Sequence, residues 1–177
     1  MTSTAKHYRP AKRDEDDIFL LILHSSSGAG TAEQLRQYFA RGEREVSYHY
    51  IVDAAGKVVT SVDVEDIAYH AGNWDTNRRS IGIGLIGVAG QHSFPAAQLQ
   101  ALVKLMARLS HQYDLSLLRV YDYADGRLYL PFGVAQHANV WGADHTDISP
   151  KFAIRDICAK ARDHRNKTFG VPRVESK

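Results

Sequence analysis

Two histidines and two aspartates lie close together in the segment from residue 137 to residue 147, which reads His-Ala-Asn-Val-Trp-Gly-Ala-Asp-His-Thr-Asp. Its apolar residues follow neither a helical nor a strand period, so we expect an ordered polar loop. Imidazole and carboxylate groups at this density could bind a metal ion or transfer protons. This loop is therefore the first candidate for a functional site.

A further histidine, His24, lies far upstream and could complete the site. It ends the apolar run of residues 18–23, which predicts a strand buried on both faces. A catalytic zinc site typically has three protein ligands, and His24, His137 and Asp147 could supply them. Because the chain contains nine histidines, hydrogen-bonded structural roles explain these residues equally well. The residues alone leave both interpretations open.

Length and composition favour one globular domain. The chain has 177 residues, of which 44% are hydrophobic and 24% charged, and these proportions are ordinary. A formal net charge of +2 gives no reason to expect a nucleic-acid partner. No segment approaches the roughly 20 apolar residues of a membrane span, and the N-terminal residues do not form a secretory signal. The single cysteine, Cys158, excludes an internal disulfide and lies in a helical pattern that predicts a buried thiol.

Strand and helix patterns alternate along the chain. Apolar faces at helical spacing predict helices over residues 31–41, 95–113 and 150–162, the first capped by Thr31 and ended by Gly42. Together with the predicted strands, they indicate an α/β fold, a single domain with a central mixed β-sheet flanked by helices. We expect a polar, loosely held N-terminal arm at 1–16, the domain at 17–165, and a polar tail or linker at 166–177.

Residues 46–52 and 57–60 predict a hairpin that turns at Gly56. Strand alternation places Tyr48 on the same side as Tyr50 and Val52, and His49 on the opposite side as a core histidine. Residues 115–120 predict another strand. Residues 121–130 fit either a hairpin or an inserted loop.

The spacing of Gly82, Gly84 and Gly87 formally matches a dinucleotide-binding fingerprint. In that fingerprint, however, the glycines lie in a turn that opens a helix, whereas here they lie within a predicted strand. A strand approached closely by a ligand or by another part of the chain explains the glycines better. Nucleotide binding remains a hypothesis that a mid-sheet position of these glycines would exclude.

Several linked motifs, in this order, resemble the zinc-dependent N-acetylmuramoyl-L-alanine amidases, a family of phage lysins, wall-recycling amidases and peptidoglycan recognition proteins. The resemblance covers about residues 18–160. The motifs are Leu-Ile-Leu-His ending at His24, residues 46–58, Ala-Tyr-His-Ala-Gly at 68–72, Asn-Arg-Arg-Ser-Ile-Gly-Ile at 77–83, Phe-Pro-Ala-Ala-Gln-Leu at 94–99, His137, and His-Thr-Asp at 145–147.

The resemblance implies that His24, His137 and Asp147 bind Zn²⁺. It also places His145 where related amidases carry a catalytic lysine, and a protonated imidazole there could stabilise an oxyanion. Many of these enzymes have a glutamate as general base at the position of Gly84. Members without that glutamate have a tyrosine in the strand that corresponds to residues 46–52, and Tyr48 fills that place.

His70, Asn77 and Trp74 resemble positions near the groove for the glycan and peptide. The alternative for His70 and Asn77 is a structural role in which each anchors a loop. The alternative for Trp74 is packing over the hydrophobic core. Both interpretations remain open.

The resemblance implies hydrolysis of the amide between N-acetylmuramic acid and L-alanine in peptidoglycan. The lack of a secretory signal and a polar tail that ends like a linker favour the catalytic domain of a phage endolysin, which we expect to be a monomer. Such a protein is made in the cytoplasm and acts on the wall after release; a cytoplasmic enzyme acting on wall fragments is the alternative. Because Gly84 replaces the usual base, and a missing base costs about 10² to 10⁴ in rate, a peptidoglycan-binding module with little turnover is the rival function.

Overall fold

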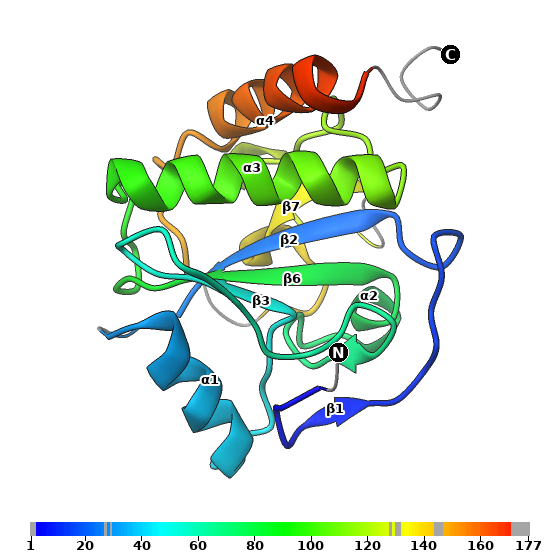
Figure 1. The fold of residues 1–177 in the computed structure, drawn as a ribbon, viewed down its shortest axis with the longest axis vertical. Coiled ribbons are helices and arrows are strands. Elements are labelled where there is room, and N and C mark those ends of the chain that lie inside the picture. Colours follow the sequence, from blue (N-terminus) through cyan, green and yellow to red (C-terminus); the bar gives the residue numbers. More distant parts are fainter. Residues whose placement is uncertain are drawn as a thin grey trace.

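A computed structural model describes residues 3–26, 28, 30–127, 129, 132–143 and 147–170. The chain forms a mixed sheet with helices on both faces (Figure 1). The five strands have the order β4-β3-β6-β2-β7, in which only β4 runs antiparallel to its neighbour. Their bounds are β2 Leu20–Ser25, β3 Tyr50–Val52, β4 Val58–Thr60, β6 Ser80–Leu85 and β7 Gly133–Gln136. The predicted fold class is confirmed.

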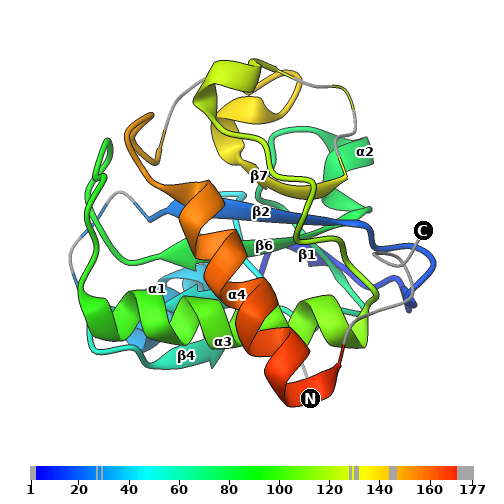
Figure 2. The ribbon, with the colours of Figure 1, turned by 90° about the horizontal axis from the view of Figure 1, so that it is seen from above.

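Helices α3 (Ala96–Gln112) and α4 (Ile154–Phe169) cover one face of the sheet, and α4 crosses over α3 (Figures 1 and 2). Helix α1 (Ala32–Arg41) covers the other face beside β3 and β4. Shorter helical segments are α2 (Trp74–Asn77) and the 3₁₀ turns η1 (Tyr123–Asp125) and η2 (His137–Asn139). Within the described part of the chain, no helix has the length and apolar character needed to cross a bilayer.

The two central strands present different residues to the two faces, as the period of two requires. On β2, Leu21 and Leu23 pack in the core under α3 and α4, whereas Leu20 and Ile22 pack on the opposite face. His24 lies two residues after Ile22 and four after Leu20, so its side chain is on the same side of β2 as theirs. It therefore belongs to the face that does not carry α3 and α4.

The side chains of strand β6 also alternate between the two faces of the sheet, but they are large on one face and small on the other. Ile81, Ile83 and Leu85 enter the core under α3. Positions 80, 82 and 84, on the opposite side, carry only Ser80, Gly82 and Gly84. This face of β6 has no large side chain of its own, so other parts of the chain can approach the strand closely.

Helix α1 follows its sequence signals. The Thr31 hydroxyl accepts a hydrogen bond from the Gln34 backbone N–H, and the Gln34 side chain accepts one from the Thr31 backbone, which forms a capping box. Gly42 ends the helix in the left-handed region at φ 70°. The predicted start and end of this helix are confirmed.

The N-terminal segment is not a loosely held arm, and that expectation is wrong for residues 3–16. Strand β1 (Tyr8–Arg9) pairs antiparallel with β5 (Ile67–Ala68). The Arg13 side chain is only 6% exposed, and its guanidinium donates to the carbonyls of Val64, Asn77 and Ser80. The polar composition of the segment gave no sign of these tertiary contacts.

Other boundaries also differ from expectation. Residues 115–119 form no strand, and only Val120 makes an isolated bridge, to Val134. Between 121 and 127 the chain forms a loop around η1, so of the two alternatives the inserted loop is correct there. Helix α4 begins at Ile154 and ends at Phe169, so the expected polar tail is helical over its first four positions. Residues 171–177 lie outside the described residues.

Candidate metal centre and active site

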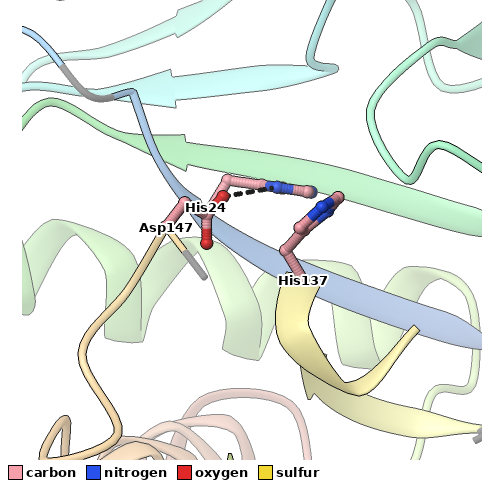
Figure 3. A group of neighbouring side chains, drawn as sticks. All are labelled: His24, His137 and Asp147. Atoms are coloured by element: carbon pink, nitrogen blue, oxygen red, sulfur yellow. Dashed lines mark hydrogen bonds and ion pairs between the residues drawn. The ribbon is translucent and has the colours of Figure 1, made fainter. Parts of the chain in front are cut away.

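Three polar side chains converge at the carboxyl end of the parallel strands (Figure 3). His24 is the fifth residue of β2, and His137 follows β7, the parallel neighbour of β2. Asp147 reaches the same point from the segment before α4. All three are buried, with exposures of 1%, 3% and 3%. The structure thus brings together the three residues predicted to bind a metal.

The geometry of this His24–His137–Asp147 cluster fits a small divalent cation. One potential ligand atom from each residue lies within 4.8 Å of the other two. Nδ1 of His24 is 3.0 Å from Oδ2 of Asp147. Ligand bonds of about 2.0–2.2 Å in a tetrahedron separate ligand atoms by about 3.4 Å, so small side-chain adjustments would suffice. Two imidazoles and one carboxylate are a donor set that suits zinc.

Asp147 is held as a carboxylate. Its burial would raise its pKa, but the hydrogen bond with His24 and the charges of both histidines outweigh burial and hold the pKa below its usual value. The other carboxylate oxygen accepts from the backbone N–H of Ile148. The cluster therefore offers one permanent negative charge in a buried position, the environment in which a cation is most strongly attracted.

Tyr48 stacks on His24, with ring centroids 4.9 Å apart and an interplanar angle of 25°. Its edge also meets Phe39, at a centroid distance of 5.3 Å. The expected common face of Tyr48, Tyr50 and Val52 is wrong: β3 begins only at Tyr50, and Tyr48 packs with the residues under α1. Burial, together with the charge on Asp147, raises the pKa of the phenol well above 10. Tyr48 therefore remains protonated and acts as a hydrogen-bond donor.

The Tyr48 ring occupies the space that a side chain at position 84 would take. A Cβ on Gly84 would lie 2.4 Å from Cδ2 and 2.6 Å from Cε2 of Tyr48, far inside van der Waals contact. A glutamate at position 84 and the tyrosine as placed are mutually exclusive. The absence of a side chain at Gly84 therefore allows the Tyr48 ring to reach His24.

The same arrangement occurs two residues earlier in β6, where the ring of His70 lies over Gly82. A Cβ on Gly82 would lie 2.5 Å from Cγ of His70. Because both glycines lie within a strand between β3 and β2, the nucleotide-binding hypothesis is wrong. The signal for their real role was the alternation of small and large residues along 80–85.

His70 is 5% exposed and contacts the cluster directly, since its Nδ1 is 3.0 Å from Nε2 of His24. Asn77 is 7% exposed, and its Oδ1 accepts from the backbone N–H groups of His70 and Ala71, which fits the loop-anchor alternative. Trp74 is 49% exposed and makes an edge contact with Tyr69. The predicted catalytic residue His145 lies outside the described residues.

The cluster opens into a cavity of about 570 Å³, a size typical of ligand sites. Trp74 is not among the described residues that line it. The cavity extends from the cluster along α1 and the segment before β3, so its wall is partly apolar and carries the charged groups of the cluster, Arg44 and Glu45. Its lining comprises His24, Ser25, Ser26, Leu35, Tyr38, Phe39, Arg44, Glu45, Val46, Tyr48, His70, His137 and Asp147.

Sequence reasoning missed two residues at the site. Ser80, fully buried, contacts His70. His49, as expected, is a buried core histidine, and its Nδ1 accepts from the backbone N–H of Gly82. Arg13, the second missed residue, lies with Nη2 2.8 Å from Nε2 of His49. The period of two along the strand could have indicated that Ser80 faces the site, whereas no local pattern indicated that Arg13 lies beside it.

The family model described as N-acetylmuramoyl-L-alanine amidase matches residues 14–151, more than three quarters of the chain. No curated protein sequence gives a significant match. Among solved structures, similar folds include the endolysin amidase LysCS from Clostridium intestinale URNW, with a TM-score of 0.62 at 15% identity over 90% of this chain and 91% of that one.

Two further structures share the fold. An AmpD derivative has a TM-score of 0.62 at 23% identity, covering 89% of this chain and 92% of its own. The catalytic domain of XlyA has a TM-score of 0.61 at 17% identity, covering 90% and 92%. At such identities the structures establish the fold, and the sequence match over residues 14–151 establishes the family.

Proposed function

Because the chain belongs to the N-acetylmuramoyl-L-alanine amidase family, we propose that it hydrolyses the amide between N-acetylmuramic acid and L-alanine in peptidoglycan with the help of a zinc ion. The observation that carries the proposal is the buried cluster of His24, His137 and Asp147, whose ligand atoms lie within 4.8 Å of one another beside a cavity. When bound, zinc supplies Lewis-acid chemistry: it polarises a carbonyl group and lowers the pKa of water.

The chain's own residues supply the remaining parts. His24, His137 and Asp147 would hold the ion, and the carboxylate of Asp147 would offset part of its charge. Tyr48 keeps its proton because of its burial, so its hydroxyl would donate a hydrogen bond that orients water or substrate oxygen. His145 would stabilise the negative charge that develops on the substrate oxygen, in the place of a lysine. His70, Asn77 and Trp74 remain candidates for the substrate groove.

Glycine at position 84 raises a second candidate function, a peptidoglycan-binding module with little turnover. The position of Tyr48 supports the enzyme instead, since the tyrosine fills the space of the missing glutamate and meets His24 at 4.9 Å between ring centroids. Wall binding without release of new L-alanine amino termini, and without any effect of chelation, would favour the binding module.

We further propose that the chain acts as a monomer and as the catalytic domain of a phage endolysin, made in the cytoplasm and reaching the wall after release. Similar folds among endolysin amidases support this role.

The experiment is digestion of purified peptidoglycan by the metal-free and the zinc-loaded protein, with mass determination of the products. The zinc-loaded parent should release peptides with a free L-alanine amino terminus. His137→Ala and Asp147→Ala should not. If either variant digests the wall as fast as the parent, the proposal is wrong.

A further inference from the structure

A chain of buried hydrogen bonds leads from the backbone to the first histidine of the cluster. The Ser80 hydroxyl lies 2.6 Å from the carbonyl oxygen of Thr76 and 3.2 Å from Nε2 of His70. Nδ1 of His70 lies 3.0 Å from Nε2 of His24. Exposures of Ser80, His70 and His24 are 0%, 5% and 1%, so solvent does not compete for these bonds.

The Ser80 hydroxyl determines which nitrogen of His70 carries a proton on the side of Ser80. The carbonyl of Thr76 can only accept, so the Ser80 hydroxyl donates its single proton there. Toward His70, the same hydroxyl must then accept, which places a proton on Nε2 of His70. A histidine that binds a metal ion does so through the lone pair of one nitrogen and keeps its proton on the other. If Nδ1 of His24 is the ligating atom, the proton lies on Nε2 of His24, and Nδ1 of His70 is placed to accept it.

Two contacts hold His70 in place, one at its backbone and one at its ring. Its backbone N–H donates to Oδ1 of Asn77. Its ring lies on Gly82, where any Cβ would be 2.5 Å from Cγ of His70. The ring meets His24 edge-on, with centroids 5.1 Å apart and an interplanar angle of 84°. An acceptor in a fixed position thus faces Nε2 of His24.

We propose that His70 and Ser80 are positioning residues that fix the tautomer and the ring direction of His24, so that Nδ1 of His24 meets the metal. Nδ1 points toward Asp147, at 3.0 Å from Oδ2, and on binding a metal ion it would give up the proton that it donates in this contact. Partners of this kind hold the second nitrogen of a ligating histidine and typically contribute 10- to 100-fold to metal affinity. The proposal rests on the proposed zinc-dependent function, but it concerns metal binding and not turnover.

The test is zinc titration of the metal-free protein by calorimetry against a competing chelator. His70→Leu removes the acceptor and should weaken zinc binding about 10- to 100-fold. His70→Asn returns an acceptor oxygen close to the place of Nδ1, and most of the affinity should return with it. Ser80→Ala removes the group that fixes which nitrogen of His70 carries the proton. It should weaken zinc binding about fivefold, the equivalent of one neutral hydrogen bond.

A spectroscopic readout separates positioning from general destabilisation. In the zinc-loaded parent, a ¹H–¹⁵N correlation should show a slowly exchanging Nε2–H of His24, which His70→Leu should remove. Ser110→Ala is the matched control for Ser80→Ala, because Ser110 is an equally buried serine that donates to a backbone carbonyl, that of Leu115, and lies on α3 away from the cluster. It should lower the melting temperature of the metal-free protein and leave the zinc affinity unchanged.

The outcomes are distinguishable. If the parent binds zinc and both His70→Leu and Ser80→Ala bind it with the parent's affinity, the positioning role is wrong while the proposed function stands. If the parent binds no zinc, the proposed function is wrong and the positioning role with it. Should His70→Leu not fold, Ser80→Ala and His70→Asn still decide, because equal affinity of Ser80→Ala and the parent overturns the role.

Discussion

Replacing Gly84 with alanine should push the Tyr48 ring away from His24. The added Cβ would lie 2.4 Å from Cδ2 of Tyr48, whereas ordinary contact begins at 3.4 Å, so the ring must withdraw by about 1 Å. Phe39 and His24 hold the ring on two sides, at centroid distances of 5.3 and 4.9 Å. Overpacking of this kind costs about 1–3 kcal/mol of folding free energy. Misplacement by about 1 Å costs a catalytic group about 10²-fold in rate.

The assay is a double-mutant cycle with Tyr48→Ala, measured by urea unfolding of the metal-free protein. In the Tyr48→Ala background the space over position 84 is empty, so Gly84→Ala should be neutral or slightly stabilising. The coupling free energy should therefore be about 1–3 kcal/mol. Gly28→Ala is the control, since its Cβ would meet only the Ser26 carbonyl oxygen at 3.9 Å.

An equal loss of stability from Gly84→Ala in both backgrounds would refute the steric argument. The same geometry changes how a restored glutamate should be interpreted. Gly84→Glu alone should not raise the rate, because it displaces Tyr48. Only together with Tyr48→Ala can it test whether a carboxylate base limits catalysis.

Three further outcomes follow from the structure. Arg13→Ala should lower the free energy of unfolding by about 2–4 kcal/mol, because it leaves buried carbonyls without donors; Arg9→Ala, at an exposed arginine of the same segment, should change it by less than about 0.5 kcal/mol. Burial and the charge of Arg13 hold the pKa of His49 well below 6.5, so at a pH just below 6.5 the unfolded chain binds a proton on His49 and the folded chain does not. The free energy of unfolding should therefore fall as the pH drops below 6.5, by up to about 1.4 kcal/mol per pH unit. Urea unfolding at pH 7 and 5.5 should show a smaller fall for His49→Asn than for the parent, and an equal fall would contradict this. Zinc at about 100 times its Kd should stabilise the parent by about 2.7 kcal/mol, and thermal unfolding should show that Asp147→Ala loses most of this effect.

The sequence predicted the elements whose signals are local. The apolar run before His24, the capping box at Thr31 and the stripe of the helix over 96–112 each depend on residues within one element. Their positions were therefore correct to within a few residues. The same is true of the hairpin, although its first strand is shorter than the alternation suggested.

The errors concern segments whose structure depends on distant partners. Two-residue strand β1 pairs with β5, and Arg13 finds its acceptors at Val64 and Ser80, none of which is visible from the composition of residues 1–16. In the same way, the apolar residues 115 and 117 enter the core without any strand pairing.

The candidate site shows the same division. The residues alone made His24, His137 and Asp147 a candidate ligand set, but only the resemblance favoured a metal centre over hydrogen-bonded structural roles. The small residues at positions 80, 82 and 84 indicated a close approach to this strand, but not that the rings of His70 and Tyr48 are the groups that approach Gly82 and Gly84. That arrangement depends on two loops meeting one strand, and it became visible only in three dimensions.

The measurement that tests the central claim most directly is zinc analysis of the purified protein combined with product masses from peptidoglycan. We expect one zinc ion per chain and peptides that begin with a free L-alanine, with both lost in His137→Ala. Digestion that yields those peptides from metal-free protein, or from His137→Ala at the parent's rate, would contradict the zinc-dependent mechanism.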